Sequence, residues 1–164
     1  MDVILVSIFT ISCFLIFVSL EFEINPIYRL FNPKSNQEAI SPQSIELYSK
    51  IILGYCQKKI GSGNKIPKVN LCYNKSDYLA TYYYPNLQIN LFVKNCKTID
   101  DLIRAIIHEY GHYVQFLGMK KGEYSRIMKE SNYNNHSWEI MSRQLAETHK
   151  EECLIYLKKI LKQQ

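Results

Sequence analysis

Residues 98–118 read TIDDLIRAIIHEYGHYVQFLG, and this stretch predicts the helix around which the rest of the chain is organised. Thr98 and Asp101 have the spacing of a capping box, in which two side chains satisfy backbone N–H groups at a helix start. Gly118 is of the residue type that most often ends helices. Apolar residues recur at helical spacing on one broad face: Ile99, Leu102, Ile103, Ile106, Ile107, Tyr110 and Val114. We therefore expect one long helix that is buried along this face.

The same stretch contains an HExxH motif, HEYGH, at residues 108–112. Two histidines at this spacing lie on one helical face, one turn apart, so His108 and His112 can both reach one zinc ion. Glu109, beside the first histidine, can reach the metal-bound water and act as its general base. Zinc lowers the pKa of that water toward ~7, which supplies a hydroxide-like nucleophile at neutral pH. The motif thus predicts a zinc site in which Glu109 is the catalytic residue.

A catalytic zinc site of this kind needs a third protein ligand. The extended motif HExxHxxGxxH is absent, because Gln115 and Gly118 occupy the positions of its glycine and third histidine. We expect the ligand to be Glu139, early in the next predicted helix, whose apolar stripe should pack it against the first helix. The helix dipole also favours a glutamate at that position without any metal. Three other residues stay open as the third ligand: Glu147, His136 and His149.

HEYGH followed by a glutamate on a later helix resembles the gluzincin metallopeptidases. The short layout of residues 42–150 is similar to the compact minigluzincin and IrrE/ImmA-like forms. In gluzincins the third ligand commonly lies in E-x-x-S-D or E-x-x-A-D/N, and here Glu139 begins E-I-M-S-R. Ser142 matches this pattern, whereas Arg143 replaces the acidic or amide residue that orients a zinc histidine in the family. The resemblance implies a zincin-like fold and peptidase activity.

The resemblance also implies two features of a peptidase cleft. The strand just before the HExxH helix, predicted at 87–93, would form the upper rim, where an extended peptide adds as an antiparallel strand. A Tyr, His or Arg side chain would stabilise the oxyanion of the tetrahedral intermediate. The candidates for this second role are Tyr124, Tyr133, His136 and Arg143.

The remaining predicted elements complete an α+β fold. The expected elements are a helix at 42–60, strands at 69–73, 79–84 and 87–93, and a final helix capped by Ser137 that continues to about residue 162. Ser41 followed by Pro42 predicts the start of the first helix, and Gly61 predicts its end. Pro85-Asn86 predicts a turn between the last two strands. We expect a short, mostly antiparallel sheet packed on the HExxH helix, together with a C-terminal glutamate helix.

Residues 3–20 form an apolar segment without a charged residue. As a helix it would span roughly 27 Å, enough for the hydrocarbon core of a bilayer. We predict a single-pass N-terminal membrane anchor at 1–22, a linker at 23–40 and a zincin-like domain at 41–164. The alternative is a cleaved signal peptide and a secreted protein, although a basic n-region and an A-x-A-like cleavage site are missing. The few basic residues after the segment leave the side of the membrane open.

Composition bounds the remaining classes of function. The chain has 164 residues, a formal charge of +5 and dispersed basic residues, which is below the pattern of a dedicated nucleic-acid-binding protein. None of the five cysteines forms a C-x-x-C motif, so a zinc knuckle is excluded. Four of these cysteines allow either two disulfides or free buried thiols: Cys56, Cys72, Cys96 and Cys153.

The sequence therefore predicts a small, membrane-tethered zinc metallopeptidase that hydrolyses a peptide or protein substrate. Zn²⁺ would be held by His108, His112 and Glu139, and Glu109 would activate the bound water. The alternative is a catalytically inactive gluzincin-like domain that binds a protein partner or senses a metal.

Overall fold

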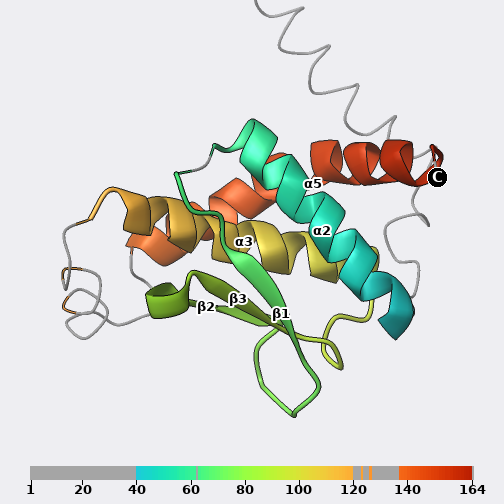
Figure 1. Cartoon of the computed structure of the whole chain (residues 1–164), viewed down its shortest axis with the longest axis horizontal. Coiled ribbons are helices and arrows are strands. Elements are labelled where there is room, and N and C mark those ends of the chain that lie inside the picture. Colours follow the sequence, from blue (N-terminus) through green and yellow to red (C-terminus); the bar gives the residue numbers. More distant parts are fainter. Residues whose placement is uncertain (1–39, 62, 120–122, 124–125, 127–136, 164) are drawn as a thin grey trace, which may run out of the picture. The chain divides into compact units, whose positions relative to one another are not determined.

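The computed structural model describes residues 40–61, 63–119, 123, 126 and 137–163, all within the unit Gln37–Gln164 (Figure 1). These residues form a mixed α/β fold that is compatible with the expected α+β class. Its main elements are α2 (Pro42–Lys59), β1 (Lys68–Cys72), β2 (Ala80–Tyr83), β3 (Gln88–Phe92), α3 (Ile99–Leu117) and α5 (Ser137–Leu161). The predicted helices and strands are all confirmed within one or two residues at each end.

The N-terminal predictions lie outside the described residues. This applies to the membrane segment at 3–20 and to nearly all of the linker at 23–40. Within the described part of the chain, no helix combines the length and the apolar character needed to cross a membrane.

The sheet is three-stranded, with the order β1-β3-β2. β2 pairs antiparallel with β3, whereas β1 pairs parallel with β3 over five residue pairs from Lys68↔Gln88 to Cys72↔Phe92. The prediction of a mostly antiparallel sheet was therefore wrong. The chain passes from β1 to the far edge, where it forms β2, and β3 returns between them in the same direction as β1.

The turn between β2 and β3 lies where Pro85-Asn86 predicted it. Tyr84–Asn86 form one turn of 3₁₀ helix, and Leu87 follows in the left-handed region with φ 49°. That conformation costs a non-glycine residue roughly 1–2 kcal/mol. Two backbone hydrogen bonds hold Leu87 in place, from its N–H to Tyr84 O at 3.2 Å and from Lys68 N–H to its carbonyl at 2.9 Å.

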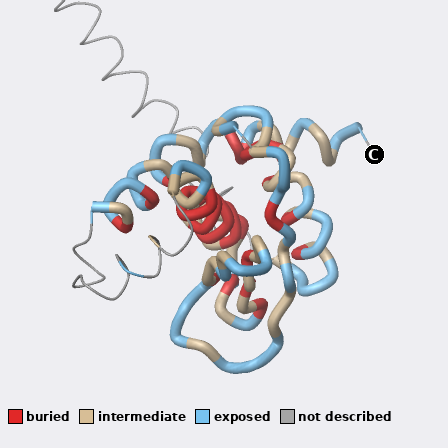
Figure 2. The backbone as a smooth tube through the Cα atoms, turned by 60° about the vertical axis from the view of Figure 1, so that its left-hand side comes forward, coloured by how far each residue is buried: buried red, intermediate tan, exposed pale blue. Residues whose placement is uncertain are grey.

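The core forms around α3, the most heavily buried helix (Figures 1 and 2). Its start is the predicted capping box: Asp101 N–H donates to Thr98 Oγ1 at 3.1 Å, and Thr98 N–H donates to Asp101 Oδ2 at 3.0 Å. Gly118 is its C-cap. On β3 the predicted alternation holds, because Ile89 and Leu91 are fully buried and their neighbours are only partly buried.

α2 and α5 complete the helical layer. Ser41 caps α2, since its side chain accepts a hydrogen bond from Ser44 N–H at 3.2 Å. The four cysteines of the described region are all free. The apolar side chain of Met141 on α5 is 55% exposed. The first turns of α5 instead bury Glu139 and Ser142, which face α3 and line the site described next.

Candidate metal centre

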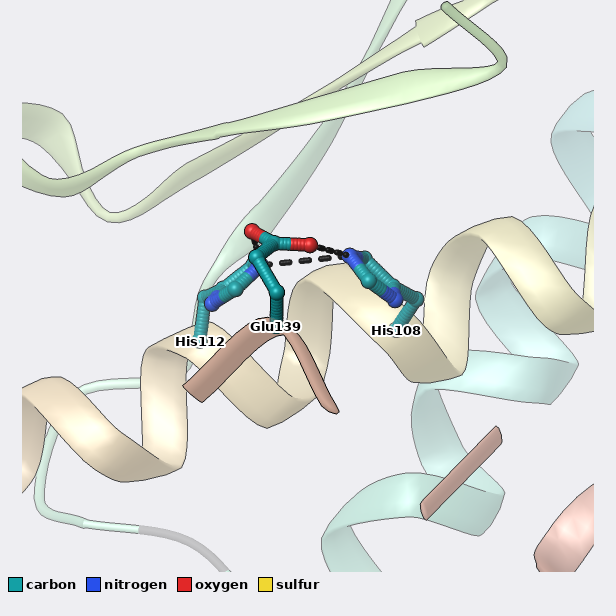
Figure 3. Close-up of side chains that lie close together, drawn as sticks. All are labelled: His108, His112 and Glu139. Atoms are coloured by element: carbon teal, nitrogen blue, oxygen red, sulfur yellow. Dashed lines mark hydrogen bonds and ion pairs between the residues drawn. The ribbon is translucent and has the colours of Figure 1, made fainter. Parts of the chain in front are cut away.

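Two imidazoles from α3 and one carboxylate from α5 converge at one point (Figure 3). Nε2 of His108 and Nε2 of His112 are 3.2 Å apart. The carboxylate of Glu139 lies against both, with Oε2 3.3 Å from His108 Nε2 and Oε1 3.0 Å from His112 Nε2. The structure therefore brings together the three residues that the sequence predicted as ligands.

The donor set fits a zinc ion. A tetrahedral ion that binds N and O ligands at about 2.0–2.1 Å holds its ligand atoms roughly 3.3 Å apart, close to the separations of 3.0–3.3 Å found between these three side chains. Three protein ligands leave a fourth position, as catalytic zinc sites do. Glu139 and His112 are 4% and 2% exposed, and buried carboxylates are normally paired or bound to a metal.

The close approach of α5 to α3 depends on Gly111, between the two histidines. A Cβ added at this glycine would lie 2.8 Å from Ser142 Oγ and 3.2 Å from the Cα of Ser142. Only a residue without a side chain allows α5 so close. Since Glu139 precedes Ser142 by one helical turn, the same packing places the Glu139 carboxylate over the histidines.

Glu109 is buried beside this cluster, on the side of the sheet. Burial raises the pKa of its carboxyl group, the charge of Glu139 acts in the same direction, and the two histidines and a hydrogen bond from the backbone N–H of Tyr82 act against them. Tyr82 lies in β2, so the sheet supplies the contact that orients Glu109. A carboxylate whose pKa is raised is a stronger proton acceptor than one at its usual pKa.

His112 has partners on both ring nitrogens. Nδ1 lies 3.1 Å from Gln115 Oε1 and 3.4 Å from Ser142 Oγ. Burial by itself would lower the pKa of His112, but the hydrogen bond to Glu139 and the charges of Glu109 and Glu139 outweigh it, so that the pKa is raised. The contact with Gln115 was missed by the sequence interpretation, which noted only that this position lacks a glycine.

The other candidate ligands are engaged elsewhere or not described. Glu147 is paired with Arg104 and Lys150 on the outer side of the α3–α5 contact. His149 Nδ1 lies 3.0 Å from the hydroxyl of Tyr55 on α2. His136 lies outside the described residues.

One oxyanion candidate lies near the cluster. Arg143 Nη2 is 4.0 Å from Glu139 Oε2, and its side chain is about half exposed. The other three candidates lie in the part of the chain that the structure does not describe: Tyr124, Tyr133 and His136.

The prediction that the strand before the HExxH helix, β3, forms the rim of a cleft was wrong. β3 is paired on both sides, by β1 and β2, so it cannot accept another strand. β1 and β2 are the two edge strands, and β2 is the one that contacts Glu109. Phe92 N–H donates to Leu79 O at 2.9 Å, and by the antiparallel alternation the backbone N–H of Tyr82 then points away from β3, toward Glu109.

Comparisons with known proteins gave no relative: no family model, no curated protein and no solved structure matches this chain. The interpretation of the site consequently depends on its own geometry.

Proposed function

We propose that this chain is a zinc-dependent peptidase of the gluzincin type. His108, His112 and Glu139 hold the metal, and Glu109 is the general base. The observation that carries the proposal is the convergence of three donor atoms at zinc-like separations. A second buried carboxylate, that of Glu109, lies next to His108 on α3.

Each residue has a separate part in this reaction. Bound zinc would polarise the peptide carbonyl and lower the pKa of water. Glu109 accepts the proton that water loses and returns it to the leaving amine, which its raised pKa favours. The N–H of Tyr82 orients the Glu109 carboxylate for both transfers.

The edge of β2 supports a peptide as the substrate. An edge strand can pair with an extended peptide through main-chain hydrogen bonds, largely independently of side-chain sequence. β2 lies at one edge of the sheet, and the N–H of Tyr82 reaches Glu109. Because Glu109 uses the Tyr82 N–H, a peptide bound along this edge would pair with the remaining backbone groups and would pass directly beside the general base.

The first experiment is the metal content of the full chain and of its Glu139→Ala variant. We expect one zinc per chain in the parent protein and a strong loss in Glu139→Ala, because a catalytic zinc site has only three protein ligands. Glu147→Gln is the matched control, since this exposed glutamate on the same helix is paired with Arg104 and Lys150. A folded parent chain that binds no zinc would overturn the proposal.

The second experiment tests catalysis with Glu109→Gln. The variant should keep its zinc and lose peptide hydrolysis by roughly 10²–10⁴-fold, since the amide cannot accept the proton. Cleavage of a peptide library, with and without a chelator, is the measurement. Zinc binding without any chelator-sensitive cleavage in the parent protein would favour the non-catalytic alternative, a metal-sensing or protein-binding domain.

A further inference from the structure

The carboxamide of Gln115 bridges α3 and α5 beside the metal centre. Its Oε1 lies 3.1 Å from Nδ1 of His112, one turn earlier on the same helix. Its Nε2 donates to the backbone carbonyl of Trp138 at 3.0 Å and to Ser142 Oγ at 3.2 Å, both on α5. The Gln115 side chain therefore contacts His112 on α3. On α5 it contacts Trp138, directly before Glu139, and Ser142, one turn after it.

The chemistry of these partners fixes the orientation of the amide. A backbone carbonyl can only accept a hydrogen bond, so the NH₂ group of Gln115 must face Trp138. The carbonyl oxygen of Gln115 must then face His112, and it also can only accept. Nδ1 of His112 consequently carries a hydrogen in the contact with Gln115, which leaves Nε2 as the ring atom that can bind a metal; without a metal, the Glu139 carboxylate 3.0 Å from Nε2 is a competing acceptor for a hydrogen on that atom.

We propose that Gln115 is a positioning residue of the metal centre. It selects the Nδ1–H tautomer of His112, which is the form that binds a metal through Nε2. It also ties the first turn of α5, and with it Glu139, to the helix that carries the histidines. The proposal deepens the proposed function and rests on the metal site described there.

The position of Arg143 strengthens this assignment. A guanidinium has no acceptor, so Arg143 cannot receive the Nδ1–H of a ligand histidine. It is about half exposed, and its Nη2 is directed to Glu139 at 4.0 Å. The possible acceptors beside Nδ1 of His112 are Gln115 Oε1 at 3.1 Å and Ser142 Oγ at 3.4 Å, and Gln115 is the nearer.

The test is the tautomer of His112 in the full chain, kept in detergent because of its apolar residues 3–20. Long-range ¹H–¹⁵N NMR distinguishes Nδ1–H from Nε2–H. The metal-free protein is measured in a Glu139→Ala background, which removes the competing acceptor at Nε2, and at a pH at which the imidazoles are neutral. We expect Nδ1–H when Gln115 is present and a shift toward Nε2–H when Gln115→Ala is added. Gln115→Glu keeps the acceptor for Nδ1–H, so it should retain the Nδ1–H tautomer.

Zinc affinity gives a second readout. Gln115→Ala should bind zinc about 10–100-fold more weakly, the usual effect of removing a hydrogen-bond partner of a metal-ligating histidine. Gln144→Ala, an exposed glutamine on α5, is the control and should bind zinc as the parent does. An Nε2–H tautomer in the Glu139→Ala background with Gln115 present, or an unchanged tautomer and affinity on Gln115→Ala, would overturn the assignment.

The two proposals fail in different ways. Absence of zinc from the parent protein would contradict the proposed function, whereas the tautomer measurement needs no metal and still decides the role of Gln115. If Gln115→Ala does not fold, the tautomers of the Glu139→Ala background with Gln115 and with Gln115→Glu decide it.

Discussion

At the scale of single residues, the unusual feature is a glycine in the middle of the helix that carries His108 and His112. Glycine in a helix interior costs about 1 kcal/mol relative to alanine. The cost at Gly111 is offset by the close contact with Ser142, which no larger residue permits. Gly54, in the interior of α2, has no atom within 4 Å of an added Cβ and therefore has no such role.

This contrast gives a matched pair of substitutions. Gly54→Ala should raise the free energy of unfolding by about 0.5–1 kcal/mol, through helix propensity and reduced freedom of the unfolded chain. Gly111→Ala should lower it by about 1–3 kcal/mol through overpacking, and should also weaken zinc binding because α5 must move. Urea unfolding and zinc titration of both variants are the measurements. Stabilisation by Gly111→Ala without loss of zinc would contradict this explanation.

The residues of the site differ in how far the sequence could identify them. His108, Glu109 and His112 follow from helical spacing alone, and Glu139 from its place in the next helix. The contacts of Gln115 and Tyr82 could not be predicted, because they depend on how α5 and β2 dock on α3. The local sequence does not show which side chains of different elements come within hydrogen-bond distance.

At the scale of elements, α3 owes its defined start to the capping box. Thr98→Ala removes the acceptor for Asp101 N–H and should lower the free energy of unfolding by about 0.5–2 kcal/mol. Thr148→Ala is the control: this exposed threonine on α5 donates only to the carbonyl of Gln144, and its replacement should change stability by less than about 0.5 kcal/mol. Urea denaturation of both variants is the measurement. Equal changes in the free energy of unfolding would show that the Thr98 cap contributes nothing to stability.

The order of the strands is the part of the fold that local patterns missed. Alternation identified β3 and its buried face, and Pro85-Asn86 identified the turn to β2. Whether β1 joins the sheet beside β2 or beside β3 depends on the path of the chain across the sheet. Val69 and Leu71 can bury the same face in either arrangement, so period-two patterning does not separate the two.

At the scale of the whole molecule, buried cysteine thiols affect how the free energy of unfolding depends on pH under alkaline conditions. Burial raises the pKa of Cys96 and of Cys153 from 9.0 to about 12. Because the folded state holds these protons more tightly than the unfolded state, their contribution is complete below pH 9 and is lost as the pH rises toward about 12.

We therefore expect the free energy of unfolding to fall progressively above pH 9. Urea unfolding at several pH values measures the slope. Burial also raises the pKa of Cys56, so Cys153→Ala removes one of three such thiols in the described region and should make the fall shallower, after allowance for its lower stability at neutral pH. The same slope in both proteins would assign the alkaline loss to other groups.

The edge strand β2 makes the molecule as a whole more prone to aggregation. A sheet edge that can pair with an extended peptide can also pair with the same strand of a second copy, which makes it a nucleus for aggregation. Tyr78 and Tyr83, at the two ends of this edge, are 62% and 50% exposed, and aromatic residues favour such pairing. Pairing of β2 with β2 of a second copy would therefore favour aggregation at high protein concentration.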